Sequence, residues 1–183
     1  NTDGTGFLKS VNYLHEFNLY KKNLLLIGAG GATKGILGPI IDVHPASITI
    51  SNRSFEKIGL LRERFNSSLL SFNLLDELNS DSNLNNYENT SSFDVIVNAT
   101  SSSVSMEDSL INPKYFGNAQ LIVDLFYAKK LTSFLKIAKE YGCNSVMDGF
   151  PMLVQQAAES FYIWTGLKPD TNRIISKRDF FFE

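Results

Sequence analysis

Cysteine and histidine are scarce in this sequence, and positive charge is not in excess. The only cysteine, Cys143, can form neither an intrachain disulfide nor a cysteine cage around a metal, and a lone thiol suits a reducing cytoplasm. The formal net charge of −2 at pH 7 provides no basic field for nucleic acid. No apolar run approaches the roughly 20 residues that a bilayer requires. We therefore expect a cytoplasmic protein without a metal site, a nucleic-acid partner or a membrane span.

The sequence does contain enough apolar residues for the core of one domain, since 43% of its 183 residues are hydrophobic and 20% are charged. Apolar and β-branched runs predict strands at residues 24–27, 47–51, 93–99, 121–125 and 144–147. Amphipathic spacing predicts helices at residues 7–17, 31–42, 55–65, 132–141, 151–165 and 172–182. Residues 79–92, rich in Asn, Ser and acidic residues, are expected to form a loop. Because strands alternate with helices, we predict an α/β fold with a doubly wound, Rossmann-like parallel sheet.

A glycine-rich segment, residues 26–35 (LIGAGGATKG), joins a predicted strand to a predicted helix, which is the context of a dinucleotide-binding fingerprint. Gly28 allows the tight turn, and Gly30 lets the backbone approach a pyrophosphate without an intervening side chain. The N–H groups and the dipole of the following helix then favour the phosphates. The usual third glycine position holds Thr33, and a plain tight turn is the alternative. We assign cofactor binding here to Gly28, Ala29, Gly30, Gly31 and Ala32.

The end of the second predicted strand distinguishes NAD from NADP. An NAD site places an acidic residue there, about 20 residues after the loop, to bind the ribose 2′-OH. This sequence has Asn52, Arg53 and Ser54 instead. The planar guanidinium of Arg53 can pair with a 2′-phosphate, and Lys57 lies one helical turn further along, where it can face the same phosphate. A solvated basic helix start is the alternative. Following the glycine loop, the pattern indicates NADP, bound by Asn52, Arg53, Ser54 and Lys57.

With these two elements placed, several strings can be interpreted together, in one order along the chain: NTDG, IGAGGATKG, NRS, NATSSS, DLFY and DGFPMLVQQAA. The chain resembles the shikimate dehydrogenases over residues 1–170, and the resemblance is poor only across residues 69–92. Several unrelated NADP enzymes share the glycine loop, whereas the opening NTDG and the closing DG…MLVxQAA are much more particular. The resemblance implies reduction of 3-dehydroshikimate to shikimate with NADPH, in aromatic amino-acid biosynthesis. It also implies two domains around a cleft, of which the second binds NADP.

The resemblance further implies roles for single residues. The family's catalytic aspartate corresponds to Asp3 in NTDG, with Asn1 beside it in the substrate site. Tyr127 and Gln156 correspond to residues that contact the substrate. Because Gln155 and Gln156 point about 100° apart on a helix, only one of them can face the cleft. Near the nicotinamide and its ribose the resemblance places Asn98, Ala99, Thr100, Ser101, Gly149 and Met152.

The resemblance has three departures. Glycine is common in the family where this sequence has Ser103, so that loop is expected to turn differently. Glycine is also common where Pro151 stands, and a proline suits the first turn of a helix and stiffens its entry. The family's catalytic lysine belongs to the preceding substrate domain, and Lys9 does not match it.

The chain begins without Met, and we expect residues 1–183 to be the NADP-binding domain of a two-domain dehydrogenase. Residues 1–20 and 148–183 are expected to pack toward the substrate domain, while Trp164, Phe161 and Leu153 are expected to pack in the core. Two alternatives remain open: an NADP-binding module without catalysis, and an enzyme that acts on quinate. The retained substrate residues favour an enzyme, because a pure cofactor binder needs none of them.

Overall fold

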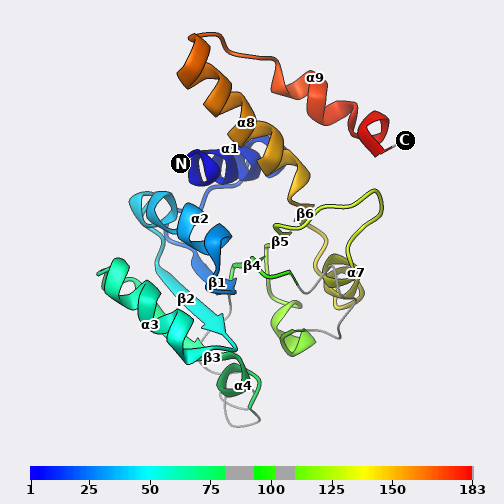
Figure 1. The fold of residues 1–183 in the computed structure, drawn as a ribbon. Coiled ribbons are helices and arrows are strands. Elements are labelled where there is room, and N and C mark those ends of the chain that lie inside the picture. Colours follow the sequence, from blue (N-terminus) through cyan, green and yellow to red (C-terminus); the bar gives the residue numbers. More distant parts are fainter. Residues whose placement is uncertain (81–92, 102–109, 183) are drawn as a thin grey trace.

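Six parallel strands form a central sheet in the computed structural model, which describes residues 1–80, 93–101 and 110–182 (Figure 1). The strands, in chain order, are β1 (Asn23–Ile27), β2 (Ser47–Asn52), β3 (Leu70–Leu74), β4 (Val95–Asn98), β5 (Leu121–Asp124) and β6 (Val146–Asp148). They lie side by side in the order β3-β2-β1-β4-β5-β6, and each neighbouring pair is parallel. The predicted α/β fold with a doubly wound parallel sheet is confirmed.

Helices connect the strands and extend the chain at both ends. In the described ranges they are α1 (Asp3–His15), α2 (Gly31–Asp42), α3 (Phe55–Arg64), α4 (Leu75–Leu78), α7 (Ser133–Glu140), α8 (Phe150–Thr165) and α9 (Thr171–Ser176), with 3-10 helices η1 (Pro113–Tyr115) and η2 (Arg178–Phe182). Ser54, Thr132 and Asp170 begin α3, α7 and α9, because each side chain accepts a hydrogen bond from a first-turn N–H. Gly166, in the left-handed conformation, ends α8.

The predicted elements are present with shifted ends, but β3 and α4 were not predicted. β3 lies at the sheet edge with half-buried and exposed side chains, so its apolar pattern is weak. The predicted tail helix at residues 172–182 is two pieces, because 3-10 hydrogen bonding at Lys177 interrupts it. The predicted loop at residues 79–92 follows α4, but its residues 81–92 lie outside the described ranges, and so does Ser103.

Both faces of the central strands are buried, because successive side chains point to opposite sides of the sheet and helices pack on each side. In β1, Leu24 and Leu26 pack with residues of α1, α2 and α8. Leu25 and Ile27 pack on the other face with residues of α4 and α7. The unbroken apolar run of this strand therefore follows from its central position in the sheet.

Three helices, α1, α2 and α8, lie together on one side of the sheet (Figure 1). Glycines bring these helices into close contact. A Cβ on Gly6 of α1 would lie 2.7 Å from the Cβ of Gln156 in α8, and a Cβ on Gly35 of α2 would collide with the carboxylate of Asp3. The first two turns of α1 therefore pack closely against both neighbours.

The end of α8 differs from the sequence prediction. Trp164 is 80% exposed, Phe161 42% and Leu153 36%, so the prediction that they pack in the core is wrong. Ile163 and Leu167 are each 65% exposed. An amphipathic pattern predicts which side of a helix is apolar but not which part of the protein covers it. The last turns of α8 extend away from the sheet (Figure 1).

Candidate functional site

The carboxyl ends of β1 and β4 form the crevice where the strand order reverses direction. In open parallel sheets, ligands bind at this switch point, because the loops on either side leave in opposite directions. The glycine loop follows β1, and residues 99–101 follow β4. The predicted fingerprint therefore lies where the topology places a ligand.

The glycine loop is held in one conformation by contacts on both sides. Gly28 has φ 110°, which favours glycine, and its N–H donates to the carbonyl of Ser51 at 2.7 Å. The hydroxyl of Thr33 donates to the carbonyl of Gly28 at 2.8 Å. Thr33 occupies the usual third glycine position, and in this protein it fixes the turn instead.

Gly30 precedes the first turn of α2 and leaves an open space at the helix N-terminus. Among the described residues, no heavy atom beyond the chain neighbours and the helix backbone lies within 4 Å of a Cβ built on Gly30 or on Gly31. The first N–H groups of a helix have no intrahelical acceptor, and with the helix dipole they favour an anion. The loop can therefore hold a phosphate close to the backbone.

A cavity of about 320 Å³ lies between this loop and the ends of β2 and β4. The predicted cofactor residues that line it are Gly28, Ala29, Gly30, Asn52, Arg53, Ser54, Lys57, Thr100 and Ser101. The predicted cofactor residues that do not line it are Gly31, Ala32, Asn98, Ala99, Gly149 and Met152. The structure thus brings together the two sequence elements that were assigned to NADP.

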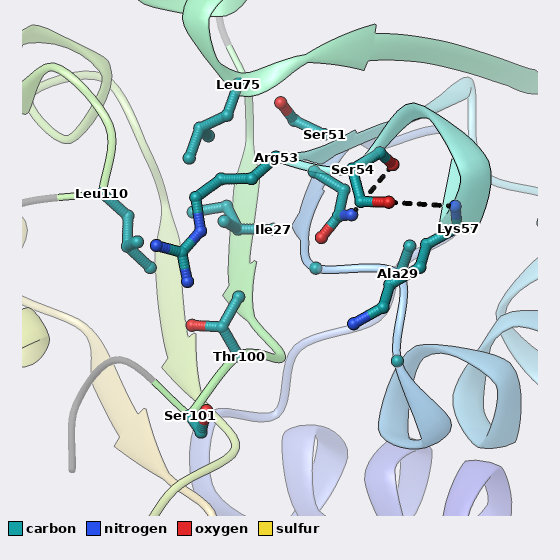
Figure 2. Close-up of a pocket in the computed structure, with 13 residues that line it drawn as sticks. Ile27, Ala29, Ser51, Arg53, Ser54, Lys57, Leu75, Thr100, Ser101 and Leu110 are labelled. Atoms are coloured by element: carbon teal, nitrogen blue, oxygen red, sulfur yellow. Dashed lines mark hydrogen bonds between the residues drawn. The ribbon is translucent and has the colours of Figure 1, made fainter. Parts of the chain in front are cut away.

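Two cationic side chains reach into the cavity from the end of β2 and the start of α3. Arg53 and Lys57 both extend over the cavity, as Figure 2 shows, and no acidic residue is among the described residues that line it. Ser54 begins α3 by accepting the N–H of Lys57 at 3.4 Å, and the amide of Asn52 donates to the Ser54 carbonyl at 3.1 Å. These bonds hold the turn from which both cations project.

Sequence patterns missed four residues of this cavity. The hydroxyl of Ser51 is buried in its wall and has no hydrogen-bond partner among the described residues. Ile27, Leu75 and Leu110 add apolar surface. Ser51 directly precedes the NRS string, so its place at the strand end was the available signal. Leu75 and Leu110 come from segments without a clear motif.

Asn98 supports the site from below the surface. It is fully buried, and its amide donates to Asp124 at the end of β5 at 3.1 Å. The side-chain oxygen of Asn98 accepts the N–H of Thr100 at 3.0 Å and the Thr100 hydroxyl at 2.7 Å. Asn98 therefore fixes the loop after β4 and presents Thr100 to the cavity.

The predicted substrate residues lie outside this cavity, at the start of the chain, after β5 and in α8. The N–H of Asp3 donates to the side-chain oxygen of Asn1 at 2.7 Å. Gln156 is half-buried and packs against Gly6 of α1, whereas Gln155 is buried and donates to the Thr171 hydroxyl at 3.3 Å. Of the two glutamines, Gln156 is the one beside the helix that carries Asp3.

Tyr127 follows β5 and is 37% exposed. Its ring stacks on Phe126, with centroids 6.3 Å apart, and packs at 6.2 Å against Phe150 at the start of α8. Gly149 is buried and Met152 is 7% exposed, at the same end of α8. Asp3 and Gln156 therefore lie in the layer formed by α1, α2 and α8. Tyr127 lies where the loop after β5 contacts the start of α8.

The described residues contain no group of three or more His, Cys, Asp or Glu side chains placed to hold a metal. Within the same ranges, no helix has the length and apolar character that crossing a bilayer demands.

Comparison of the sequence with known proteins shows which family it matches. The sequence model described as "Shikimate / quinate 5-dehydrogenase" matches residues 11–127, and "Shikimate 5'-dehydrogenase C-terminal domain" matches residues 149–176. The shikimate dehydrogenase (NADP(+)) of Nitrosospira multiformis is 38% identical over 96% of this chain and 60% of that protein. Its counterpart from Vibrio cholerae serotype O1 is 39% identical over 96% of this chain and 59% of that protein.

A solved structure shows the same architecture. The Ael1 enzyme from Pseudomonas putida superposes with a TM-score of 0.85 and 36% identity, over 97% of this chain and 62% of that one. The chain spans about 60% of the length of the curated relatives that it matches.

Proposed function

This chain belongs to the shikimate / quinate 5-dehydrogenase family, as its motifs predicted, and from that premise we propose that it is the cofactor-binding part of an NADP-dependent shikimate dehydrogenase. The observation that supports NADP as the cofactor is the presence of Arg53 and Lys57 in the cavity beside the glycine loop. No acidic residue is among the described residues that line this cavity. The proposed reaction interconverts 3-dehydroshikimate and shikimate. Shikimate is the substrate in the name of the relatives.

The residues of the cavity fit NADP. The open space at Gly30 accommodates a pyrophosphate against the backbone. Arg53 and Lys57 suit the extra 2′-phosphate, which carries the negative charge that NAD lacks. The buried hydroxyl of Ser51 offers a donor and acceptor to the adenosine side of the cofactor. Leu75 supplies an apolar surface to the same cavity.

The substrate residues have roles that follow from the chemistry. When bound, the nicotinamide supplies or accepts the hydride. Reducing a ketone leaves an alkoxide, so a proton donor must lie beside that oxygen. In our assignment Asp3 orients and tunes a lysine donor from the rest of the protein, because a carboxylate favours the ammonium form. Asn1, Tyr127 and Gln156 contact the substrate.

The apolar end of α8 supports a two-domain arrangement. We assign residues 1–183 to the NADP-binding domain, with residues 1–20 and 148–183 packing against the substrate domain. The relatives are longer than this chain, and large side chains of α8, such as Trp164 and Phe161, are exposed. Exposed apolar surface of this extent marks an interaction site. We also propose a cytoplasmic location, which suits the free, buried thiol of Cys143.

Steady-state assays of the protein that carries this chain test the proposal. Shikimate should be oxidised with NADP⁺ in preference to NAD⁺, and quinate should be the poorer substrate. Asp3→Asn should lower kcat by about 10² to 10⁴-fold, the usual contribution of acid–base groups, with little change in NADPH affinity. Preference for quinate would assign the other substrate of the family. NADPH binding without turnover of either substrate would identify a cofactor-binding module and contradict the proposed enzyme.

A further inference from the structure

The C-terminal segment turns back toward the start of α8. After α8 the chain reverses, α9 packs beside it, and the C-terminus returns toward the end of β6 (Figure 1). Arg178, the first residue of η2, makes the connection. No family motif includes this residue, and the NADP assignment does not use it.

Arg178 bonds to both loops at this edge of the sheet. Its guanidinium donates to both carboxylate oxygens of Asp148 at the end of β6, with 2.7 Å to Oδ1. It also donates to the carbonyl of Ala128, in the loop after β5, at 2.6 Å. The guanidinium carbon lies 5.3 Å from the ring centroid of Phe150. One planar side chain thus joins the loop after β5, the end of β6 and the start of α8.

The two loops also contact each other directly. The N–H of Gly149 donates to the carbonyl of Phe126 at 3.1 Å, and the backbone of Leu125 leaves no room for a Cβ on Gly149. Asp148 accepts the N–H of Phe150 at 3.2 Å through Oδ1. Tyr127 stands between these joined segments, next to Ala128 in the chain and against the Phe150 ring.

We propose that Arg178 is a positioning residue for the substrate, because its bridge from Asp148 to Ala128 sets the placement of Tyr127 and of Gly149. The inference rests on the proposed function, which assigns substrate contact to Tyr127. The ion pair with Asp148 and the contact of Phe181 with the Phe150 ring would hold η2 against the protein without the bond to Ala128. The further bond to Ala128 fixes the backbone next to the tyrosine, on the opposite side from the contact between Gly149 and Phe126.

The chemistry of the pair makes the bridge specific for arginine. The Asp148 side chain is only 5% exposed, so its oxygens find their hydrogen-bond donors within the protein rather than in water. A guanidinium presents donors in a rigid plane and can bind a carboxylate with two of them while a further N–H reaches a carbonyl. A lysine ammonium keeps the charge but lacks this planar fork.

The test compares Arg178→Gln with Arg173→Gln, since Arg173 is an exposed arginine of the adjacent α9. In the protein that carries this chain, Arg178→Gln should raise KM for shikimate about tenfold or more, because small misplacement of a substrate contact is costly. The Kd of NADPH should change much less than the KM, since the bridge lies outside the cavity beside Arg53 and reaches the assigned cofactor residues only at Gly149. Hydrogen exchange at residues 125–128 and at Gly149 should become faster. Arg173→Gln should change none of these.

Three outcomes would overturn the proposal: an unchanged KM in Arg178→Gln, an equal change in Arg173→Gln, or unchanged exchange around Tyr127. If Arg178→Gln also loses NADPH binding, the milder variant Arg178→Lys provides the test. Its KM for shikimate should rise while its affinity for NADPH is kept. An unchanged KM in that variant contradicts the bridge. A wild-type protein without shikimate turnover contradicts the proposed function instead, and the exchange measurement then still tests the bridge.

Discussion

At the scale of single residues, selectivity for the cofactor depends on charge at the end of β2. Arg53 and Lys57 project from a turn that Ser54 and Asn52 hold by hydrogen bonds to the backbone. Two cations over one cavity favour a phosphate more strongly than a neutral ribose hydroxyl. The sequence assigned these residues from their types and their place after the second predicted strand, and the structure adds that both extend over the same cavity (Figure 2).

Replacing Arg53 tests this assignment. Arg53→Ala should weaken NADPH binding by about 1.5–3 kcal/mol, the range for a charge-assisted hydrogen bond, and should leave NADH binding nearly unchanged. Isothermal titration with both cofactors measures the difference. Arg62→Ala is the matched control, because Arg62 lies on α3, the helix that follows Arg53, with its guanidinium 5.2 Å from the Phe72 ring. Equal affinities of the wild type for NADPH and NADH would contradict the assignment of NADP.

Replacing Gly30 tests the phosphate site sterically. Gly30→Val should abolish NADPH binding and leave the melting temperature nearly unchanged. In the part of the chain that the structure describes, no atom beyond the chain neighbours lies within 4 Å of the added Cβ, and Gly30 has φ −89° and ψ −164°, an extended conformation that valine adopts readily. The expected collision is therefore with the pyrophosphate alone. Fluorescence titration and thermal unfolding measure the two effects, and normal NADPH binding by the variant would place the phosphate elsewhere.

At the scale of elements, close helix contacts position the substrate residues. Gly6 lets α1 approach the backbone of α8 at Gln156, and Gly35 lets α2 approach Asp3. Interiors are packed closely enough that one added side chain at such a contact must move a helix. The geometry of the substrate residues is thus linked to the packing of the α1–α2–α8 layer.

A valine at this contact should affect stability and geometry together. Gly6→Val places a Cβ 2.7 Å from both the Cβ and the backbone nitrogen of Gln156, and overpacking of this kind costs about 1–3 kcal/mol. Chemical denaturation should show that loss. Gly59→Val is the control, because a Cβ on this glycine of α3 meets nothing within 4 Å. A smaller loss in Gly6→Val than in the control would show that α1 and α8 are not in close contact.

At the scale of the whole molecule, the exposed end of α8 is the feature that a single domain leaves unexplained. Trp164 is the only tryptophan of this chain, and it is 80% exposed. Tyr162, Ile163 and Leu167 are also exposed. In our assignment, the substrate domain covers part of this surface, and this contact helps to hold the two domains together.

The fluorescence of Trp164 provides the measurement. In the 183-residue chain alone, the emission should resemble that of tryptophan in water and should be quenched readily by acrylamide. In the longer protein, the contribution of Trp164, obtained by difference from Trp164→Phe, should shift to shorter wavelength and resist quenching, because burial removes water from the indole. The same exposure of Trp164 in both proteins would show that the substrate domain does not cover this part of α8.

The sequence by itself determined the features that depend on neighbours along the chain. The apolar runs specify buried strands, residues 26–35 specify the phosphate loop, and the residues after β2 specify the charge near the cofactor. Each of these is complete within about ten residues, so one sequence suffices to predict it. The strand β3 was missed because an edge strand needs no strong apolar pattern.

Only the tertiary structure decided which distant segments meet. The order of the strands brings Leu75 and Leu110 to the same cavity as Arg53. The return of the C-terminus joins Arg178 to Ala128 and Asp148, which lie 50 and 30 residues away in the sequence. Such contacts depend on the order of strands and the path of crossovers, which no local pattern contains.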